Sequence, residues 1–298
     1  MKRLIIFILL GSIIGSGFAQ QLTTSSLFEM QGSLHNPSVA GVQKHSTVGA
    51  SFRSMWSGFP GGPQTGFVFG SGFIKKYKLG LGGYLYSDVT GPTKRTGLQM
   101  AYAYHIPLAK EASFSIGIEG RFQQFSFDKN KLQQSLGNDP VLGNTDTRFK
   151  GDAGLGISFT KKKFQAGISV SQLIQSKLDF YSGNLPRSNE SKLYRHYYLH
   201  SYYTWDVDGN TKIIPNFLFI YLPNSPLEFQ GGARVEHMET FWWGFSLRAH
   251  QSMMVSAGVK VRKKFTIGYS FDIYRTPLSV YDNGSNAHEF IVKYDFLK

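Results

Sequence analysis

The sequence contains no cysteine, and this absence removes several kinds of chemistry at once. Disulfide bonds, thiolate metal sites and thiol nucleophiles are all excluded. Long apolar runs are missing as well. Beyond the N-terminus, no segment reaches the roughly eighteen consecutive apolar residues that a membrane-spanning helix requires. Glycine, in contrast, is frequent, with 33 residues, which disfavours long helices and suits strands and turns.

The N-terminus predicts a secretory signal peptide over residues 1–19. Lys2 and Arg3 precede a mostly apolar run at 4–14, and the small residues Gly17 and Ala19 lie just before a plausible cleavage point at Gln20. An uncleaved anchor is the alternative interpretation. An exported chain without disulfides must rely on a continuous hydrogen-bonded sheet, which a closed barrel provides without leaving an open edge.

Acidic residues are few compared with basic ones. The formal charge is +13, from 32 Lys and Arg against 19 Asp and Glu, and removal of Lys2 and Arg3 leaves about +11. A basic chain often binds nucleic acid, but export argues against a nucleic-acid partner here. Outer-membrane lipid head groups or an acidic partner fit the compartment better, and the alternative is that the charge only keeps the turns soluble.

Alternation of apolar and polar residues dominates the rest of the chain. In residues 98–106 the even positions are Leu, Met, Tyr, Tyr and Ile, and the odd positions are Gln, Ala, Ala and His. Side chains change face at every strand residue, so such a segment is apolar on one side only. Tilted strands of about nine to eleven residues cross a bilayer, apolar toward lipid and polar toward a lumen. The pattern predicts an all-β fold, a single-chain antiparallel transmembrane β-barrel, with strands at 46–54, 64–74, 78–87, 96–106, 112–127, 148–160, 163–171, 194–206, 211–221, 227–236, 240–250, 252–261, 264–273 and 288–297.

The lengths of the connections support this interpretation. One set of turns is short throughout, whereas the opposite set includes the long segments 128–147, 172–193 and 274–287, with short exceptions at 222–226 and near Gln251. Outer-membrane barrels have short periplasmic turns, longer outer loops and an even number of strands. We therefore expect about fourteen strands with both termini in the periplasm, a barrel over 46–298, and an N-terminal lead-in at 20–45. This lead-in lies in the lumen or covers the periplasmic mouth. Charges of both signs on the inner face predict ion pairs across the lumen.

Several of the short turns are basic and fall on the same predicted side. Lysine stems at strand ends can lie along the apolar band with their charged ends in water. These candidate periplasmic residues are Lys75, Lys76, Lys161, Lys162, Lys163, Arg262, Lys263 and Lys264.

The best candidate for a functional site is the connection between Gly91 and Gly97. Pro92 after Gly91 makes a stiff turn. Lys94 and Arg95 then present two cations at the outer mouth, where they are candidates for partner binding. The alternative is a structural turn that folds back over the lumen and pairs with carboxylates on the inner face.

Arg53 and Trp56 also have two interpretations. They contact the lead-in as part of a plug, or they anchor the barrel at the membrane interface. His196 and His200 are four residues apart, which on a strand separates them by roughly 13 Å, too far to share one metal ion. The sequence predicts no metal and no cofactor, and Ser, His and Asp residues form no recognisable catalytic arrangement, so we do not predict an enzyme.

The chain resembles a known family. The resemblance is carried by residues 36–41 (Asn-Pro-Ser-Val-Ala-Gly), 52–59, 62–65, 80–82, 88, 91–97, 102–108 and the start of the last strand at 288–290. These segments are similar to the PorP/SprF group of outer-membrane proteins of the Bacteroidetes type IX secretion system. In residues 27–35 the chain departs from the more aromatic stretch that other members carry. The resemblance implies a barrel that works with type IX secretion and, in some members, gliding motility, supporting export or surface anchoring of a partner adhesin.

Three hypotheses for function follow. The first is an accessory barrel that binds a secreted surface protein, type IX components such as the periplasmic lipoprotein ring, or both. The second is an outer-membrane channel for small solutes or apolar compounds, although a small-molecule substrate is the less favoured partner. The third is a structural link to the cell wall through the basic turns.

Overall fold

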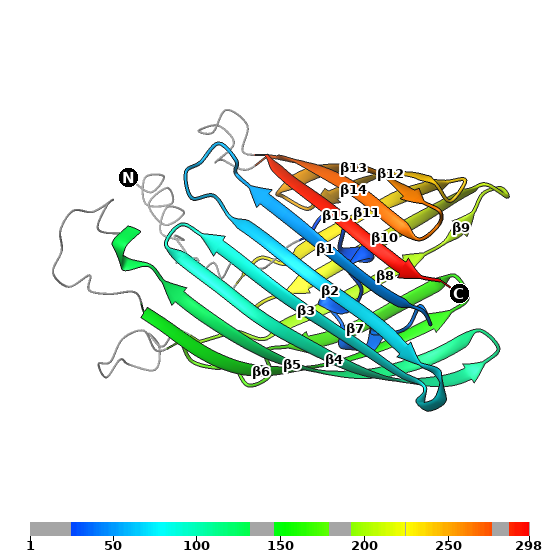
Figure 1. Cartoon of the computed structure of the whole chain (residues 1–298), viewed down its shortest axis with the longest axis horizontal. Helices are drawn as coiled ribbons and strands as arrows, with labels where there is room; N and C mark the ends of the chain where they lie inside the picture. The colour runs from blue at the N-terminus through cyan, green and yellow to red at the C-terminus, as the bar shows by residue number, and fades with distance from the viewer. Residues whose placement is uncertain (1–24, 132–145, 179–191, 224, 276–285, 298) are drawn as a thin grey trace, which may run out of the picture.

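The strands of the chain form one antiparallel sheet that closes into a barrel (Figure 1). The computed structural model describes residues 25–131, 146–178, 192–223, 225–275 and 286–297. The first and last strands, β1 and β15, pair with each other and close the barrel, and β10 pairs with the next strand, β11, so the ring is complete. The strands are β1 (Ser46–Met55), β2 (Gln64–Ile74), β3 (Leu79–Thr90), β4 (Thr93–Ala109), β5 (Ala112–Phe127), β6 (Asp146–Lys161), β7 (Phe164–Ser171), β8 (His196–Tyr203), β9 (Trp205–Asp206), β10 (Thr211–Tyr221), β11 (Glu228–His237), β12 (Phe241–Arg248), β13 (Ser252–Val261), β14 (Phe265–Tyr274) and β15 (Ala287–Phe296).

The barrel has fourteen strands, as the sequence predicts, because β9 is a continuation of β8. Thr204 separates β8 from β9. Both segments pair with β10, β9 near its start and β8 further along it. The single predicted strand at 194–206 is therefore broken in two. The other thirteen predicted strands correspond to β1–β7 and β10–β15; β2, β5, β10 and β13 have the predicted bounds, and the rest are shifted at one or both ends.

The largest shift occurs at the hairpin between β3 and β4. The sequence predicts a connection from 88 to 95, but the strands run on to Thr90 and from Thr93, so only Gly91 and Pro92 form the turn. The two strands were predicted too short at this hairpin because the outer face of a strand becomes polar where the strand leaves the bilayer. Alternation then disappears from the sequence while the hydrogen-bonded ladder continues.

Side chains alternate between the two faces of the wall as the pattern requires. Outward-facing Leu85 and Phe122 are more than half exposed, which is the expected state of a residue that faces lipid. Inward-facing Glu119 and Gln99 are buried. The inner face is not uniformly polar, since Phe67 and Phe69 also point inward and are buried.

The residues before β1 fill the interior of the barrel. They form three short 3-10 turns, η1 (Phe28–Met30), η2 (Gly32–Leu34) and η3 (Pro37–Val39), which lie inside the ring of strands in Figure 1. No helix among the described residues is long and apolar enough to cross a membrane. The lead-in was expected either in the lumen or over the periplasmic mouth, and residues 25–41 lie in the lumen. The predicted signal peptide lies outside the described residues.

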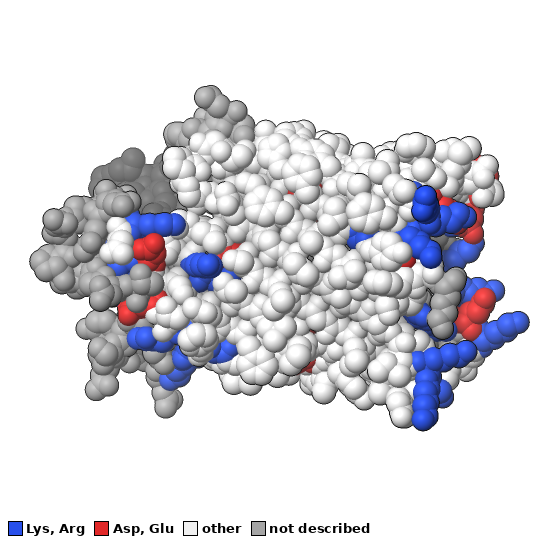
Figure 2. All heavy atoms as spheres, in the orientation of Figure 1, with Lys and Arg blue, Asp and Glu red and all other residues white. Residues whose placement is uncertain are grey.

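The two ends of the barrel differ. One end carries only short connections, including η4 (Lys75–Tyr77), and there the start of β1 pairs with the end of β15, Ser46 opposite Phe296. The other end carries the three long predicted loops, which lie mostly outside the described residues. Figure 2 shows charged side chains at both ends and an almost uncharged band between them, as a membrane-spanning surface requires. That the short-turn end faces the periplasm stays a prediction.

Candidate functional site: a plugged lumen with a basic mouth

Residues 25–45 form a plug segment that occupies the lumen. Every side chain from Ser25 to Gly41 is buried apart from Gly32, which is exposed, and Glu29, which is half-buried. Ser25 lies toward the long-loop end of the barrel, beside Glu289, and Lys44 lies at the short-turn end just before β1. The plug segment therefore runs along the barrel axis rather than across one mouth.

The first anchor of the plug segment is a buried charge cluster around Arg53. The Arg53 guanidinium lies 2.6 Å from an Asp272 carboxylate oxygen and 3.1 Å from one of Glu289, and all three side chains are fully buried. Arg53 also donates a hydrogen bond of 2.7 Å to the Ser26 hydroxyl. Ser25 and the backbone N–H of Ser26 both donate to Glu289. Each of these buried charges has a partner, which is the condition for burying charge without a large cost.

The second anchor is the Asn36-Pro37-Ser38 sequence. The Asn36 amide donates to the carbonyl oxygens of Ile157 and Ile168 at 3.1 and 3.2 Å, which belong to paired residues of β6 and β7. Its own oxygen accepts from the backbone N–H of Ser38 at 2.9 Å and caps η3. One side chain thus fixes the start of η3 and ties it to the wall.

Glycines in the wall make this contact possible. They are Gly117 of β5, Gly156 of β6 and Gly167 of β7. A Cβ atom at Gly117 would lie 2.3 Å from the Ser38 nitrogen, and one at Gly156 would lie 2.1 Å from the Asn36 amide oxygen. The plug segment packs directly on the strand backbone, so no larger residue fits at these positions.

The end of the plug segment is held in the same way. The Ala40 carbonyl lies 2.8 Å from a ring nitrogen of His105, and a Cβ atom at Gly80 would lie 1.8 Å from the Ala40 oxygen. The N–H of Gly41 donates to the Ser71 hydroxyl, and Gly41 has a φ of +70°, which favours glycine. Residues 36–41 are thus bound along their whole length.

Ion pairs line the inner face of the wall, and one of them reaches the plug segment. Glu119 accepts from Arg121 of the same strand at 2.7 Å and from Gln99 at 2.6 Å, and Gln99 also donates to the carbonyl of Ser33. Arg234 lies 3.2 Å from the carboxylate of Glu29 in the plug segment. The predicted inner-face pairs exist, and the plug segment supplies an acid to this last pair.

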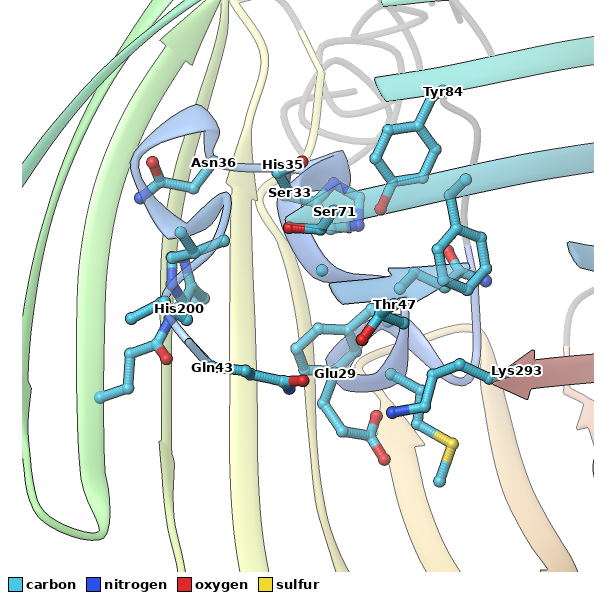
Figure 3. A pocket seen from close by; sticks show the side chains of 18 of the residues that line it. Glu29, Ser33, His35, Asn36, Gln43, Thr47, Ser71, Tyr84, His200 and Lys293 are labelled. Atoms are coloured by element: carbon cyan, nitrogen blue, oxygen red, sulfur yellow. The ribbon is translucent and has the colours of Figure 1, made fainter. Parts of the chain in front are cut away.

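Apolar packing completes the filling of the lumen. Leu27, Met30 and Leu34 of the plug segment form a buried cluster with five wall residues, Phe67, Phe69, Tyr84, Trp242 and Ile291. Burying each such side chain contributes about 1.5–3 kcal/mol. Beside this cluster, a cavity of about 60 Å³ remains between the plug segment and the wall, lined in part by Glu29, His200 and Lys293 (Figure 3). It has room for a few water molecules and no more.

The candidate residues of the long-loop end lie in two connected turns. The N–H of Gly91 donates to the carbonyl of Gly61 at 2.9 Å, and the carbonyl of Pro92 accepts from Asp128. Arg95 points inward, 3.5 Å from Asp88 and over the ring of Tyr86. This is the inner carboxylate pairing that was one of the two interpretations of Arg95.

Lys94 and Trp56 lie apart from that inner group. Lys94 is exposed on the other face of β4, so the two cations of this connection do not act together. Trp56 is half-buried in the β1–β2 connection, and its backbone N–H donates to the carbonyl of Asn286, whereas Arg53 contacts the plug segment through Ser26.

The predicted basic turns share one end of the barrel. Lys75 and Lys76 lie in η4, Lys161 to Lys163 join β6 to β7, and Arg262 to Lys264 join β13 to β14. Some of these residues pair with nearby acids: Lys162 with Glu111, Lys163 with Asp206, and Lys263 with Glu239. Hydrogen bonds from Lys263 and Lys212 lower the pKa of Glu239 to about 2.

Sequence reasoning missed the partners of Arg53 and the role of Asn36. The sequence predicts ion pairs on the inner face, but Asp272, Glu289, Ser25 and Ser26 were not linked to Arg53. The available signal was a pair of inward-facing acids near Arg53. Glu289 of β15 lies opposite Arg53, and Asp272 lies on the next strand, β14.

These observations define a transmembrane β-barrel of the outer membrane whose lumen is filled by its own N-terminal segment. Residues 17–294 match the family described as type IX secretion system membrane protein PorP/SprF, and the chain belongs to that family. The expected resemblance is thereby confirmed. A search of curated proteins finds no match.

Solved outer-membrane barrels share the fold at very low sequence identity. The toluene transporter TbuX of Ralstonia pickettii has a TM-score of 0.55 and 9% identity, with 88% of this chain and 92% of that chain covered. Omp33 of Acinetobacter baumannii has a TM-score of 0.52 and 8% identity, covering 85% and 98%. The monoaromatic hydrocarbon channel CymD has a TM-score of 0.52 and 8% identity, covering 88% and 92%. At this identity the likeness is one of fold.

Proposed function

We propose that this barrel is a non-enzymatic accessory component of the type IX secretion system that binds a partner protein and supports its export or surface anchoring. Family membership supports the system in which it works. The single observation that carries the proposal is the plugged lumen. The plug segment is held by hydrogen bonds to a buried charge cluster, by the ion pair of Glu29 with Arg234 and by apolar packing, and the cavity beside it measures about 60 Å³.

A barrel without an open lumen acts through its ends and its outer surface. At the long-loop end, the linked turns at Gly61 and Gly91 form a rigid platform. At the short-turn end, basic turns ring the mouth. We assign the long-loop end to a secreted surface protein, an adhesin, and the basic end to periplasmic components of the secretion machine. A role in gliding motility follows if the anchored adhesin is the one that moves over the surface.

The alternative function is a channel for small solutes or apolar compounds. The observation that favours it is the fold shared with a toluene transporter and a monoaromatic hydrocarbon channel. Such a function requires the plug segment to move. The buried contacts of the plug segment oppose that movement, because it would break the hydrogen bonds of Ser26 to Arg53 and Glu289 and would leave the Glu29 carboxylate without Arg234.

Crosslinking in the native host tests the accessory role. The tagged full-length protein is crosslinked in intact cells and purified, and the bound proteins are identified. We expect a large secreted surface protein or type IX components, and loss of that surface protein from cells lacking the barrel. Recovery of neither, together with normal surface display in the deletion strain, contradicts the proposal. An unrelated outer-membrane barrel carrying the same tag serves as the control.

A further inference from the structure

A recess of about 1260 Å³ lies at the short-turn mouth, below the end of the plug segment. Inward-facing side chains of neighbouring strands, among them Phe73, His105, Ser113 and Thr160, form part of its wall, and Gly41 and Val42 of the plug segment close it on the lumen side. Its volume exceeds the roughly 300–1,000 Å³ of a typical small-molecule pocket. Its size therefore suits a segment of a macromolecule.

Cations from separate parts of the chain line this recess. Lys44 comes from the plug segment, Lys75 and Lys78 from the η4 turn, Lys162 from the β6–β7 turn, and Lys264 from the β13–β14 turn. Among the described residues of the lining, Glu111 is the single acidic side chain, and it lies 3.8 Å from Lys162. Five lysines facing one such acid leave a strong excess of positive charge around one recess.

Most of these lysines have no opposite charge of their own. Within the described residues, Lys44, Lys75, Lys78 and Lys264 form no ion pair. Basic side chains elsewhere at this end behave differently, since Lys163 and Lys263 are paired with Asp206 and Glu239. Like charges held around a common recess repel one another, and an anionic occupant removes that repulsion.

The lining also has an apolar part. Phe73, Pro107, Ala109 and Ala112 contribute from the wall. Tyr294 and Phe296 border the recess at the end of β15, but they lie on the outward face of that strand, whereas Lys293 and Asp295 lie on its inner face. Phe73 and His105 belong to the inner face of the strands, opposite the face that contacts lipid. An occupant that reaches Phe73 enters from the aqueous mouth, which favours a water-soluble polypeptide over a bilayer lipid.

We propose that this recess binds an acidic peptide segment of a partner protein, with its carboxylates on Lys44, Lys75, Lys78 and Lys264 and its apolar side chains on Phe73 and Pro107. The inference rests on the proposed function in one respect: it takes the short-turn end as the side from which secretion components approach. It adds the chemistry of the segment that is recognised.

Binding of a model peptide tests the site. The full-length barrel in phosphatidylcholine nanodiscs is titrated into a fluorescein-labelled decapeptide rich in glutamate, and anisotropy is followed at low and at physiological salt. A peptide with every glutamate replaced by glutamine is the negative probe. We expect binding of the acidic peptide only, weakened as salt rises.

Two triple variants locate the binding. K44E/K75E/K78E reverses three lysines of the recess, and K76E/K161E/R262E reverses three exposed cations at the same end that do not line it. Both change the net charge equally. We expect the dissociation constant to rise at least tenfold in the recess variant and less than threefold in the control. Heat-modifiable migration on gels checks that both variants fold.

Several results overturn the proposal. They are equal losses in the two variants, binding of the glutamine peptide, no binding by the wild type at low salt, or displacement of the peptide by short-chain phosphatidylglycerol with the same dependence on the recess lysines. The last result assigns the site to lipid head groups. Peptide binding with no partner crosslinked in cells contradicts only the proposed function. A crosslinked partner retained by K44E/K75E/K78E contradicts only the recess.

Discussion

Arg53 and Glu289 lie directly opposite each other where the first and last strands of the barrel meet, and their side chains form an ion pair of 3.1 Å inside the lumen. The same pair binds Ser25 and Ser26 of the plug segment. One buried cluster therefore links the seam where the barrel closes to the start of the plug segment.

Removing the Arg53 charge destabilises the barrel. R53M leaves Glu289 buried without its cation and leaves Asp272 with a longer pair to Arg248, 3.8 Å away, which costs about 3–5 kcal/mol for a broken buried pair. Urea unfolding in detergent, followed by tryptophan fluorescence, measures the change. K94M, at an exposed position of β4, is the control and should stay within about 0.5 kcal/mol of wild type. Equal stability of R53M and wild type would show that the cluster does not hold the fold.

Adding one methyl group to the wall displaces the plug segment. In G117A the new Cβ atom would lie 2.3 Å from the Ser38 nitrogen, whereas at Gly120 of the same strand nothing lies within 4 Å. Because the chain has no cysteine, V39C supplies a single reporter thiol in the plug segment. We expect maleimide labelling of V39C to accelerate at least tenfold in G117A and to be unchanged in G120A. Equal labelling rates in all three backgrounds contradict the packing described here.

The Asn36 side chain is a second independent anchor. N36L removes two hydrogen bonds to β6 and β7 and the cap of η3, leaving the Ile157 and Ile168 carbonyls without this donor. We expect a loss of about 1–3 kcal/mol in unfolding free energy and faster labelling of V39C. Hydrogen–deuterium exchange over residues 36–41 provides the readout. Unchanged exchange in N36L would assign retention of the plug to the Arg53 cluster alone.

The pairing of Glu239 predicts a pH dependence at the short-turn end. Its pKa is lowered from 4.5 to about 2, chiefly by the hydrogen bond from Lys263, so its contribution to stability is present above its ordinary pKa and is lost as pH falls through about 2. Infrared titration of carbon-13-labelled glutamate should show this group still ionised at pH 3. K263M should raise its midpoint, and K264M, at the neighbouring unpaired lysine, should not. A midpoint near 4.5 in the wild type would contradict the geometry.

The sequence alone predicts the wall of this barrel well, because alternation reports which face of a strand meets lipid. Val68 and Phe122 face outward and Glu119 faces inward as the pattern indicates. It predicts the filling of the lumen poorly. The contact of Ser26 with Glu289 joins residues 263 positions apart, and no local periodicity encodes such a pair. Phe67 and Phe69 point inward because the plug segment offers them an apolar partner, which a pattern based on a water-filled lumen does not anticipate.

Ion conductance in planar bilayers tests the central claim, that the N-terminal segment closes the lumen, most directly. The purified wild-type barrel should insert without producing steady current, and a variant lacking residues 25–40 should conduct. G117A, which keeps the whole chain, should show intermittent openings, so the test does not depend on the deletion variant folding. A steady open pore from the wild type would contradict the account and favour the channel function instead.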